Sequence, residues 1–175
     1  MNIVVFCASS DNVGEQYRTV ARELGRKIAR CGHTLIYGGA TGGLMDEVAQ
    51  GARDEDGEVI GIIPESIVER GRMSELPTTL YRVDTMAERK EMMTEMADLF
   101  IALPGGFGTL DEMMTTISAC KVGETEARTI IVNINGFYDP LVEQIRRFTA
   151  EGIGKANDSE CYSVVNSIDE LKIEN

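Results

Sequence analysis

The ten residues from Leu103 to Glu112, Leu-Pro-Gly-Gly-Phe-Gly-Thr-Leu-Asp-Glu, join a glycine-rich turn to a pattern typical of a helix start. The apolar run that precedes this turn, residues 99–103, predicts a buried strand. Glycines let backbone N–H groups approach a ligand without an intervening Cβ, and a helix N-terminus adds unpaired N–H donors with partial positive charge. Together these features predict an anion site, most often one for phosphate. The spacing matches neither the dinucleotide-binding fingerprint nor the P-loop.

A purely structural explanation fits the same residues. Thr109 and Glu112 have the spacing of a capping box, in which both side chains satisfy backbone N–H groups at a helix start. Thr85 and Glu88 form a second pair with this spacing, further upstream. For the glycine-rich loop, the spacing alone leaves a structural cap and a functional site equally open. The density of glycine and the elements around the loop favour function.

The helix expected just before the strand at residues 99–103 carries two cations beside its apolar stripe. Met86, Met93 and Ala97 recur at helical spacing, so we expect them to face the core. Arg89 and Lys90 lie on either flank of this stripe. An inward cation is costly unless it is paired, and extension to solvent is the structural alternative. Because this helix begins at the same sheet edge as the glycine-rich loop, we favour a guanidinium that binds a phosphate or a ribose hydroxyl.

Glu112 is a candidate for acid–base or electrostatic chemistry. On a helical wheel it lies opposite the apolar stripe of Leu110, Met113, Met114 and Ile117, which predicts exposure. Its place in the first helical turn nevertheless puts it beside the expected ligand crevice. A carboxylate there could polarise a sugar hydroxyl, activate water or stabilise a cationic transition state.

Strands and helices alternate along the rest of the chain. Short apolar runs predict strands at residues 2–7, 34–37, 58–63, 80–83, 99–103, 129–133 and 162–165. Helical periodicity and caps predict helices at residues 15–30 (with a cap at 12–15), 44–54, 85–96, 109–121, 140–150 and 167–171. Residues 65–79 lack periodicity and predict a loop with room for one short helical turn. Continuously apolar strands that alternate with helices predict an α/β fold, a Rossmann-like doubly wound parallel sheet in a single domain over residues 1–175.

Three loops rich in small residues each follow an expected strand. They cover residues 7–14, 38–43 and 104–108, and Ser9 lies in the first of them. In a parallel sheet, ligands bind beyond the carboxyl ends of the strands, near the point where the strand order reverses. Three such loops at one edge predict a nucleotide-sized ligand. We expect three residues of the second loop to lie near its phosphate or ribose: Gly39, Thr41 and Gly42.

Composition excludes several classes of protein. The formal net charge of −12 argues against a nucleic-acid polymer as partner. No apolar stretch approaches the ~20 residues of a membrane span, and no signal peptide is visible, so we expect a cytoplasmic protein. Four scattered cysteines, Cys7, Cys31, Cys120 and Cys161, form no CxxC pair, and we expect them to be reduced and free of metal. His33 is the only histidine and is expected to be a loop residue that cannot build a metal site by itself.

The sequence resembles a known family over nearly its whole length, and four segments carry the resemblance. Gly38–Met45 (Gly-Gly-Ala-Thr-Gly-Gly-Leu-Met), Met86–Lys90 (Met-Ala-Glu-Arg-Lys), Pro104–Glu112 and Asn133–Asp139 resemble segments of the Lonely Guy (LOG) family. Members of that family are cytokinin riboside 5′-monophosphate phosphoribohydrolases, long mislabelled as lysine decarboxylases. The resemblance implies cleavage of the N-glycosidic bond of a nucleoside 5′-monophosphate to free base and ribose 5-phosphate. It implies a homodimer and neither a metal nor a redox cofactor.

The resemblance also assigns residues. It implies that Arg89 and Glu112 are catalytic. Nucleotide contacts are implied for Arg89, Lys90, Gly105, Gly106, Phe107, Gly108, Thr109, Glu112 and Ser118. Glycosidic cleavage passes through an oxocarbenium-like state, so Glu112 would orient a ribose hydroxyl or water and offset the ribosyl cation. Arg89 would hold the substrate and assist departure of the base.

Two departures from the family pattern bear on the base that is recognised. Ala87 stands where the family often has histidine, and the first loop begins with Ala8 where Gly-Ser-Ser is usual. One alternative is a general AMP or purine nucleotide nucleosidase in salvage. Another is a non-catalytic nucleotide sensor or carrier, although retention of both Arg89 and Glu112 argues against it. A decarboxylase is disfavoured because no lysine lies in a recognisable cofactor-binding context.

Overall fold

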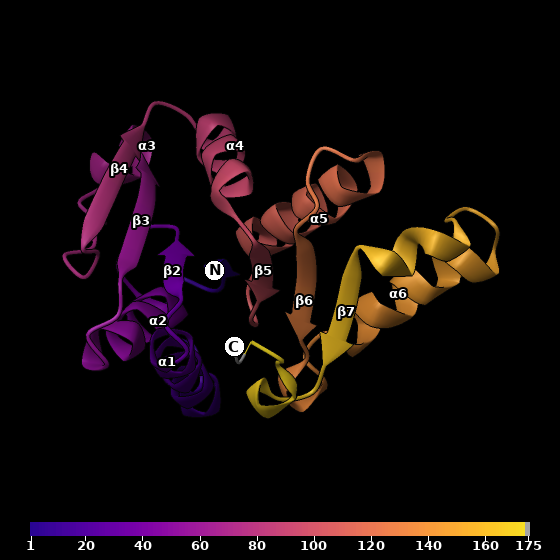
Figure 1. The fold of residues 1–175 in the computed structure, drawn as a ribbon, viewed down its shortest axis with the longest axis horizontal. Helices are drawn as coiled ribbons and strands as arrows, with labels where there is room; N and C mark the ends of the chain where they lie inside the picture. Colours follow the sequence, from indigo (N-terminus) through magenta and orange to yellow (C-terminus); the bar gives the residue numbers. More distant parts are fainter. Residues whose placement is uncertain (174–175) are drawn as a thin grey trace.

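The computed structural model describes residues 1–173, which form a parallel seven-stranded sheet in the order β4-β3-β2-β1-β5-β6-β7 (Figure 1). The strands are β1 (Asn2–Phe6), β2 (Thr34–Tyr37), β3 (Val59–Pro64), β4 (Thr79–Val83), β5 (Leu99–Ala102), β6 (Arg128–Val132) and β7 (Tyr162–Val165). The α-helices are α1 (Glu15–Arg30), α2 (Gly43–Asp54), α3 (Glu65–Val68), α4 (Met86–Met96), α5 (Phe107–Val122) and α6 (Asp139–Ala150). Three 3₁₀ turns complete the chain: η1 (Ile134–Gly136), η2 (Ala156–Glu160) and η3 (Ile168–Glu170). The predicted Rossmann-like α/β fold is confirmed.

The helix ends differ from the sequence expectations in a few places. Helix α5 begins at Phe107, two residues before the expected start, because Gly106 is its N-cap residue. Gly14 is the N-cap residue of α1, and no side chain caps that helix. The short helix α3 is the one helical turn for which the sequence left room in the loop at residues 65–79. The helix expected at 167–171 is only a 3₁₀ turn, since so short a segment does not recover the cost of helix nucleation.

The strand order reverses between β1 and β5. From β1 the chain adds β2, β3 and β4 outward on one side, then returns to place β5 on the other side of β1. Ile3 pairs with Leu99 and Phe6 with Ala102, so the two strands end together. The loops that follow them stay in contact, because Ala8 N–H donates to the Pro104 carbonyl at 3.1 Å. This switch point is where an open α/β sheet binds ligands.

Helices cover both faces of the sheet, and β1 shows why its sequence is continuously apolar. Ile3 and Val5 pack into the core under α1 and α2. Val4 and Phe6 point to the opposite face and pack with Met93 of α4. All of these side chains are buried, as the period of two along a doubly covered strand requires.

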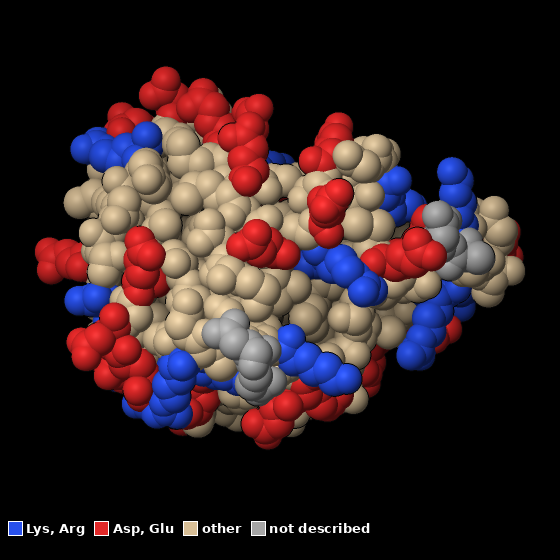
Figure 2. Space-filling view, viewed as in Figure 1, with Lys and Arg blue, Asp and Glu red and all other residues tan. Residues whose placement is uncertain are grey.

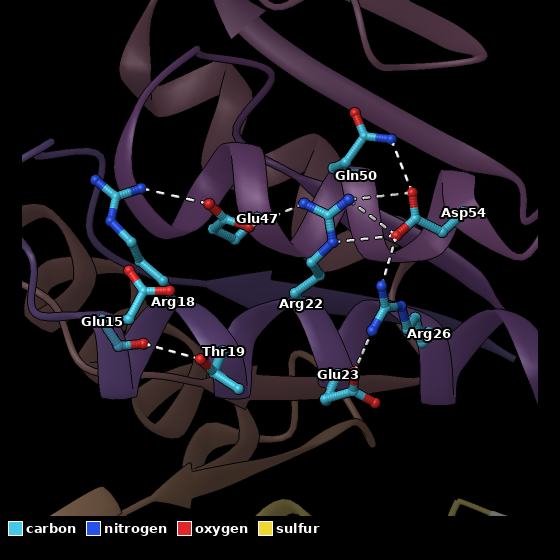
Figure 3. Close-up of polar contacts among 9 residues, drawn as sticks. All are labelled: Glu15, Arg18, Thr19, Arg22, Glu23, Arg26, Glu47, Gln50 and Asp54. Carbon is cyan, nitrogen blue, oxygen red and sulfur yellow. Dashed lines mark hydrogen bonds and ion pairs between the residues drawn. The ribbon is translucent and has the colours of Figure 1, made fainter.

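Helices α1 and α2 pack directly against each other, and polar contacts join them (Figure 3). A Cβ added to Gly25 would lie 2.0 Å from the Val48 carbonyl oxygen, and one added to Gly51 would lie 2.0 Å from the Arg22 carbonyl oxygen. Across the same contact, the Arg22 guanidinium donates to both carboxylate oxygens of Asp54. This helix pair fixes α2, and with it the loop at 38–43 that leads into α2.

One prediction about the cysteines is wrong. Cys120, in the last turn of α5, and Cys161, just before β7, form a disulfide with a Cα–Cα distance of 5.7 Å. They are 41 residues apart in sequence, so no local spacing could have paired them. Cys7 is a free, buried thiol, as expected. His33 lies between α1 and β2, as expected, but its side chain is buried.

Charged side chains of both signs alternate on the face shown in Figure 2, where the basic groups do not merge into a continuous patch. Within residues 1–173, no helix is long and apolar enough to cross a membrane. The same residues contain no cluster of three or more His, Cys, Asp or Glu side chains that could hold a metal ion.

Candidate active site

A cleft of about 290 Å³ opens at the carboxyl edge of the sheet, beside the switch point. It is bounded by the loop after β1, the first turns of α4 and α5, and one residue of α2. Its lining residues are Cys7, Ala8, Ser9, Ser10, Met45, Met86, Arg89, Gly106, Gly108, Thr109 and Glu112. The cleft therefore gathers residues that are far apart in sequence.

Arg89 and Glu112 meet in this cleft as a buried ion pair. Arg89 extends from α4 and Glu112 from α5, and Arg89 Nη2 lies 3.0 Å from Glu112 Oε1. Their side chains are only 8% and 4% exposed. The exposure expected for Glu112 is therefore wrong, because the Arg89 side chain extends from α4 to the side of α5 that the helical wheel assigned to solvent.

Burial dominates the electrostatics of this pair. It raises the pKa of the Glu112 carboxyl above its ordinary value of 4.5, and the neighbouring Arg89 guanidinium opposes that rise. Burial, followed by the charge of Glu112, also raises the pKa of the Cys7 thiol, which therefore stays protonated at neutral pH. Glu112 thus depends on Arg89 to hold a negative charge in a site with little solvent.

The first turn of α5 is free of a side-chain cap. Gly106 is the N-cap residue, and among the residues that the structure describes no side-chain cap bond is formed at this helix start. The capping box expected from Thr109 and Glu112 is therefore not formed, whereas the Thr85 hydroxyl does accept the Glu88 N–H at 3.1 Å at the start of α4. The first N–H groups of a helix have no intrahelical acceptor. Those of residues 107–109 consequently remain available to an anion in the cleft.

The contact with Glu112 does not use all the N–H donors of the Arg89 guanidinium. It carries five N–H groups. Besides the contact with Glu112, its Nη1 lies 3.7 Å from Met86 Sδ. Its Nε is buried without a hydrogen-bond partner among the residues that the structure describes. A ligand in the cleft can therefore bind Arg89 without displacing Glu112.

The second glycine-rich loop does not supply anion-binding donors. Gly42 N–H and the Thr41 hydroxyl both donate to Asp46 Oδ2, at 2.7 and 2.9 Å. Gly43 N–H donates to Asp11 Oδ1 at 3.0 Å. Thr41 and Gly42 line a neighbouring cavity that shares Ser9 and Ser10 with the cleft. A Cβ on Gly39 would lie 3.2 Å from Ile62 N, Ile63 Cβ and Leu80 Cδ1, so Gly39 packs against β3 and β4. The structure thus does not bring Gly39, Thr41 and Gly42 together with the Arg89–Glu112 pair.

Other expected site residues lie at or beyond the rim. Lys90 Nζ pairs with Asp111 Oδ2 at 2.9 Å, outside the cleft. Phe107 is 93% exposed, and Ser118 is exposed on α5 away from the cleft lining. Met86 was expected in the core but is 39% exposed and lines the cleft, because the first turn of α4 projects past the sheet edge.

Gly105 lies against Thr109, one of the residues that line the cleft. A Cβ on Gly105 would lie 2.1 Å from Thr109 Oγ1, so Gly105 makes room for the buried Thr109 side chain. The close approach that Gly105 permits is therefore to the Thr109 side chain and not to a ligand. It holds the turn in the shape that presents the N–H groups of the first turn of α5.

Sequence reasoning did not assign four further lining residues: Cys7, Ala8, Ser10 and Met45. Cys7 directly follows β1, one of the two strands at the switch point, and the strand order could have pointed to it. Met45 lies in the first turn of α2, where helical spacing alone indicates a core position. Cys7, Met45 and Met86 give the cleft an apolar lining beside the ion pair, and Met86 Sδ lies 3.7 Å from Arg89 Nη1.

A doubly wound parallel sheet with a cleft at its switch point places the protein among the Rossmann-like α/β proteins. A molybdenum cofactor carrier protein from Chlamydomonas reinhardtii shares the fold, with a TM-score of 0.72 and 21% identity over 96% of this chain and 90% of that one. A molybdenum cofactor binding protein from Rippkaea orientalis superposes with a TM-score of 0.69 and 20% identity, over 95% and 89% of the two chains.

Closer sequence relatives define the family. The family model described as "Possible lysine decarboxylase" matches residues 45–174. The cytokinin riboside 5′-monophosphate phosphoribohydrolase of Rhodococcoides fascians is 38% identical over 152 residues, covering 86% of this chain and 77% of its own length. The rice (Oryza sativa subsp. japonica) enzyme LOG is also 38% identical, over 86% of this chain and 62% of its own length. The protein belongs to the LOG family, and it spans less than two thirds of that rice relative.

Proposed function

We propose that the protein hydrolyses the N-glycosidic bond of a nucleoside 5′-monophosphate, giving the free base and ribose 5-phosphate. The observation that carries this proposal is the buried Arg89–Glu112 pair beside the uncapped N-terminus of α5. A carboxylate and a cluster of N–H donors line one cleft, as a reacting sugar that bears a phosphate requires. Relatives named cytokinin riboside 5′-monophosphate phosphoribohydrolases support the same reaction.

The cleft provides a place for each part of the substrate. The phosphate would accept hydrogen bonds from the N–H groups of residues 107–109. The ribose would lie over Glu112, and the base would pack against the apolar side chains of Met45 and Met86. In the reaction the C1′–N bond breaks and its electron pair leaves with the base. Water then supplies a hydroxyl to C1′ and a proton to the base.

Glu112 would act on the positive charge that develops at C1′. An ionised carboxylate beside the ribosyl cation stabilises it and can orient the attacking water. Arg89 opposes the rise in the pKa of Glu112 that burial causes, so it favours the ionised form. The unused N–H groups of Arg89 would bind the ribose or the departing base.

We also propose that the protein is a homodimer. Phe107 at the mouth of the cleft and Val122 on α5 are large apolar side chains that a second copy could cover. Light scattering coupled to size exclusion tests this assembly.

The cytoplasm is the proposed location, and disulfides such as Cys120–Cys161 are uncommon there. Trapping thiols in intact cells tests that location.

The test of the reaction is to incubate the protein with AMP and with N6-isopentenyl-AMP under metal chelation. Free base and ribose 5-phosphate are expected, and their absence with both substrates would overturn the proposal. Product from AMP alone would favour purine salvage, and tight binding without product would favour a carrier. Glu112→Gln should abolish turnover, and Arg89→Ala should lower kcat/KM by about 10³-fold while leaving a measurable rate. Asp111→Asn is the matched control, because Asp111 is the adjacent carboxylate and pairs with Lys90 outside the cleft.

A further inference from the structure

Gly38, the first residue after β2, lies directly against the guanidinium of Arg89. A Cβ added to Gly38 would lie 2.0 Å from Arg89 Nη2 and 3.0 Å from Arg89 Cζ. These distances are far below van der Waals contact. Any side chain at position 38 would therefore occupy the space that the guanidinium now fills.

The need for glycine here is one of space and not of backbone conformation. Gly39, the next residue, has a φ of +65°, a left-handed conformation that side chains other than glycine rarely adopt. Gly38 is not among the residues with positive φ. The backbone at position 38 would thus accept alanine, and the obstacle is the arginine.

The atom that a methyl group would displace is the one that contacts Glu112. Arg89 Nη2 lies 3.0 Å from Glu112 Oε1. Because Nη2 is at the far end of a flexible side chain, the clash can be relieved by rotating the guanidinium away, without moving the backbone. Arg89 would then leave Glu112 while the fold stays intact.

We propose that Gly38 is a positioning residue: its missing side chain makes the room in which Arg89 holds Glu112. This inference rests on the proposed function for its catalytic meaning, but the geometry it concerns exists without substrate. It gives the second glycine-rich loop a role in the site that is not phosphate binding. The loop after β2 meets the ion pair at Gly38, which lies against the Arg89 guanidinium.

The first readout needs no activity. The carboxyl of Glu112, labelled with ¹³C, is titrated by NMR in the full chain. The charged and titratable groups around it are Arg89 and Lys90 on α4, Asp111 on α5 and the Cys7 thiol after β1. Gly38→Ala and Arg89→Ala should raise the pKa of Glu112 by similar amounts. An unchanged titration in Gly38→Ala would overturn the inference even if the protein proves inactive on every nucleotide.

The second readout is a double-mutant cycle on kcat/KM with AMP. Gly38→Ala should lower kcat/KM by about 10²-fold, as for a catalytic group moved by roughly 1 Å. In an Arg89→Ala background, the same change should have no further effect. Equal losses in both backgrounds would show that Gly38 acts independently of Arg89 and would overturn the inference.

Stability separates this role from a structural one. Gly38→Ala should remain folded and lower Tm by about as much as Arg89→Ala, because both changes leave Glu112 without its partner. The matched control is Gly39→Ala, whose positive φ predicts a clear loss of stability and the same relative loss of kcat/KM with or without Arg89. Unfolding of Gly38→Ala would show that the fold needs this glycine, which would contradict the proposed displacement of a flexible side chain.

Discussion

Breaking the buried ion pair with Arg89→Met should destabilise the protein more than removing both charges. The two groups are 3.0 Å apart, so their attraction is about 5–6 kcal/mol at an effective dielectric constant near 20. Burial opposes this attraction, and the raised pKa of Glu112 shows that burial is the larger effect on the carboxylate. The intact pair therefore adds little net stability.

Removing one partner leaves the other charge buried and unpaired. We expect Arg89→Met to lower the free energy of unfolding by about 3 kcal/mol at pH 7. For a chain of 175 residues this corresponds to a fall in Tm of about 6–12 °C. The double variant Arg89→Met/Glu112→Leu should return to within about 1 kcal/mol of the parent or exceed it, because apolar groups of similar volume need no desolvation. Both variants should lose nearly all activity.

The pH dependence has a definite sign. The folded state binds the Glu112 proton more tightly than the unfolded state, because its pKa is raised. This contribution to stability is fully present below the unfolded pKa, near 4.5, and is lost as the pH rises through the folded value. Without Arg89 the folded pKa should be higher still. The defect of Arg89→Met should therefore shrink between pH 7 and pH 5.

Urea unfolding followed by circular dichroism at these two pH values measures both effects. The double variant serves as the control, because it has no charge at either position and should show no such pH dependence. A single variant as stable as the parent, or a double variant less stable than Arg89→Met, would refute the reasoning that the pair is kept for chemistry.

Three further outcomes follow from particular contacts. Gly108→Val should raise the KM for AMP about tenfold at unchanged Tm, because Gly108 lines the cleft and a Cβ there would meet no other atom within 4 Å. An unchanged KM would place the phosphate elsewhere. Gly25→Ala and Gly51→Ala should each lower the free energy of unfolding by at least about 2 kcal/mol in urea, because their Cβ atoms would collide with backbone carbonyls. The activity of the folded fraction should be unchanged. Reduction of the Cys120–Cys161 disulfide should lower the free energy of unfolding by about 4 kcal/mol, given its 41-residue loop. A Cys120→Ser variant should not respond to reductant, and equal stability of oxidised and reduced parent would contradict the bridge.

The sequence by itself determined the elements and the class of fold. Strand patterns such as that of β1 depend on a local period and on burial from both sides, and both are visible in the run of apolar residues. The alternation of such runs with helical patterns then leaves few arrangements besides a doubly wound parallel sheet. The position of the cleft follows from the same alternation, because loops after parallel strands meet at one edge.

The details of the site depended on contacts between elements. Thr85 and Thr109 each precede a glutamate by three residues, yet only Thr85 caps its helix. The turn before α5 enters the helix through Gly106, three positions before Thr109, and so leaves Glu112 free for Arg89. A helical wheel could not predict this burial, because the wheel contains no information about α4.

Only the tertiary structure decided what each glycine and cysteine does. Gly38 and Gly42 belong to one loop, but one makes room for Arg89 while the other donates to Asp46. Cys120 meets a partner 41 residues away. Local patterns report how a residue fits its own helix or strand, whereas ion pairs, close approaches and disulfides depend on which elements the fold places side by side.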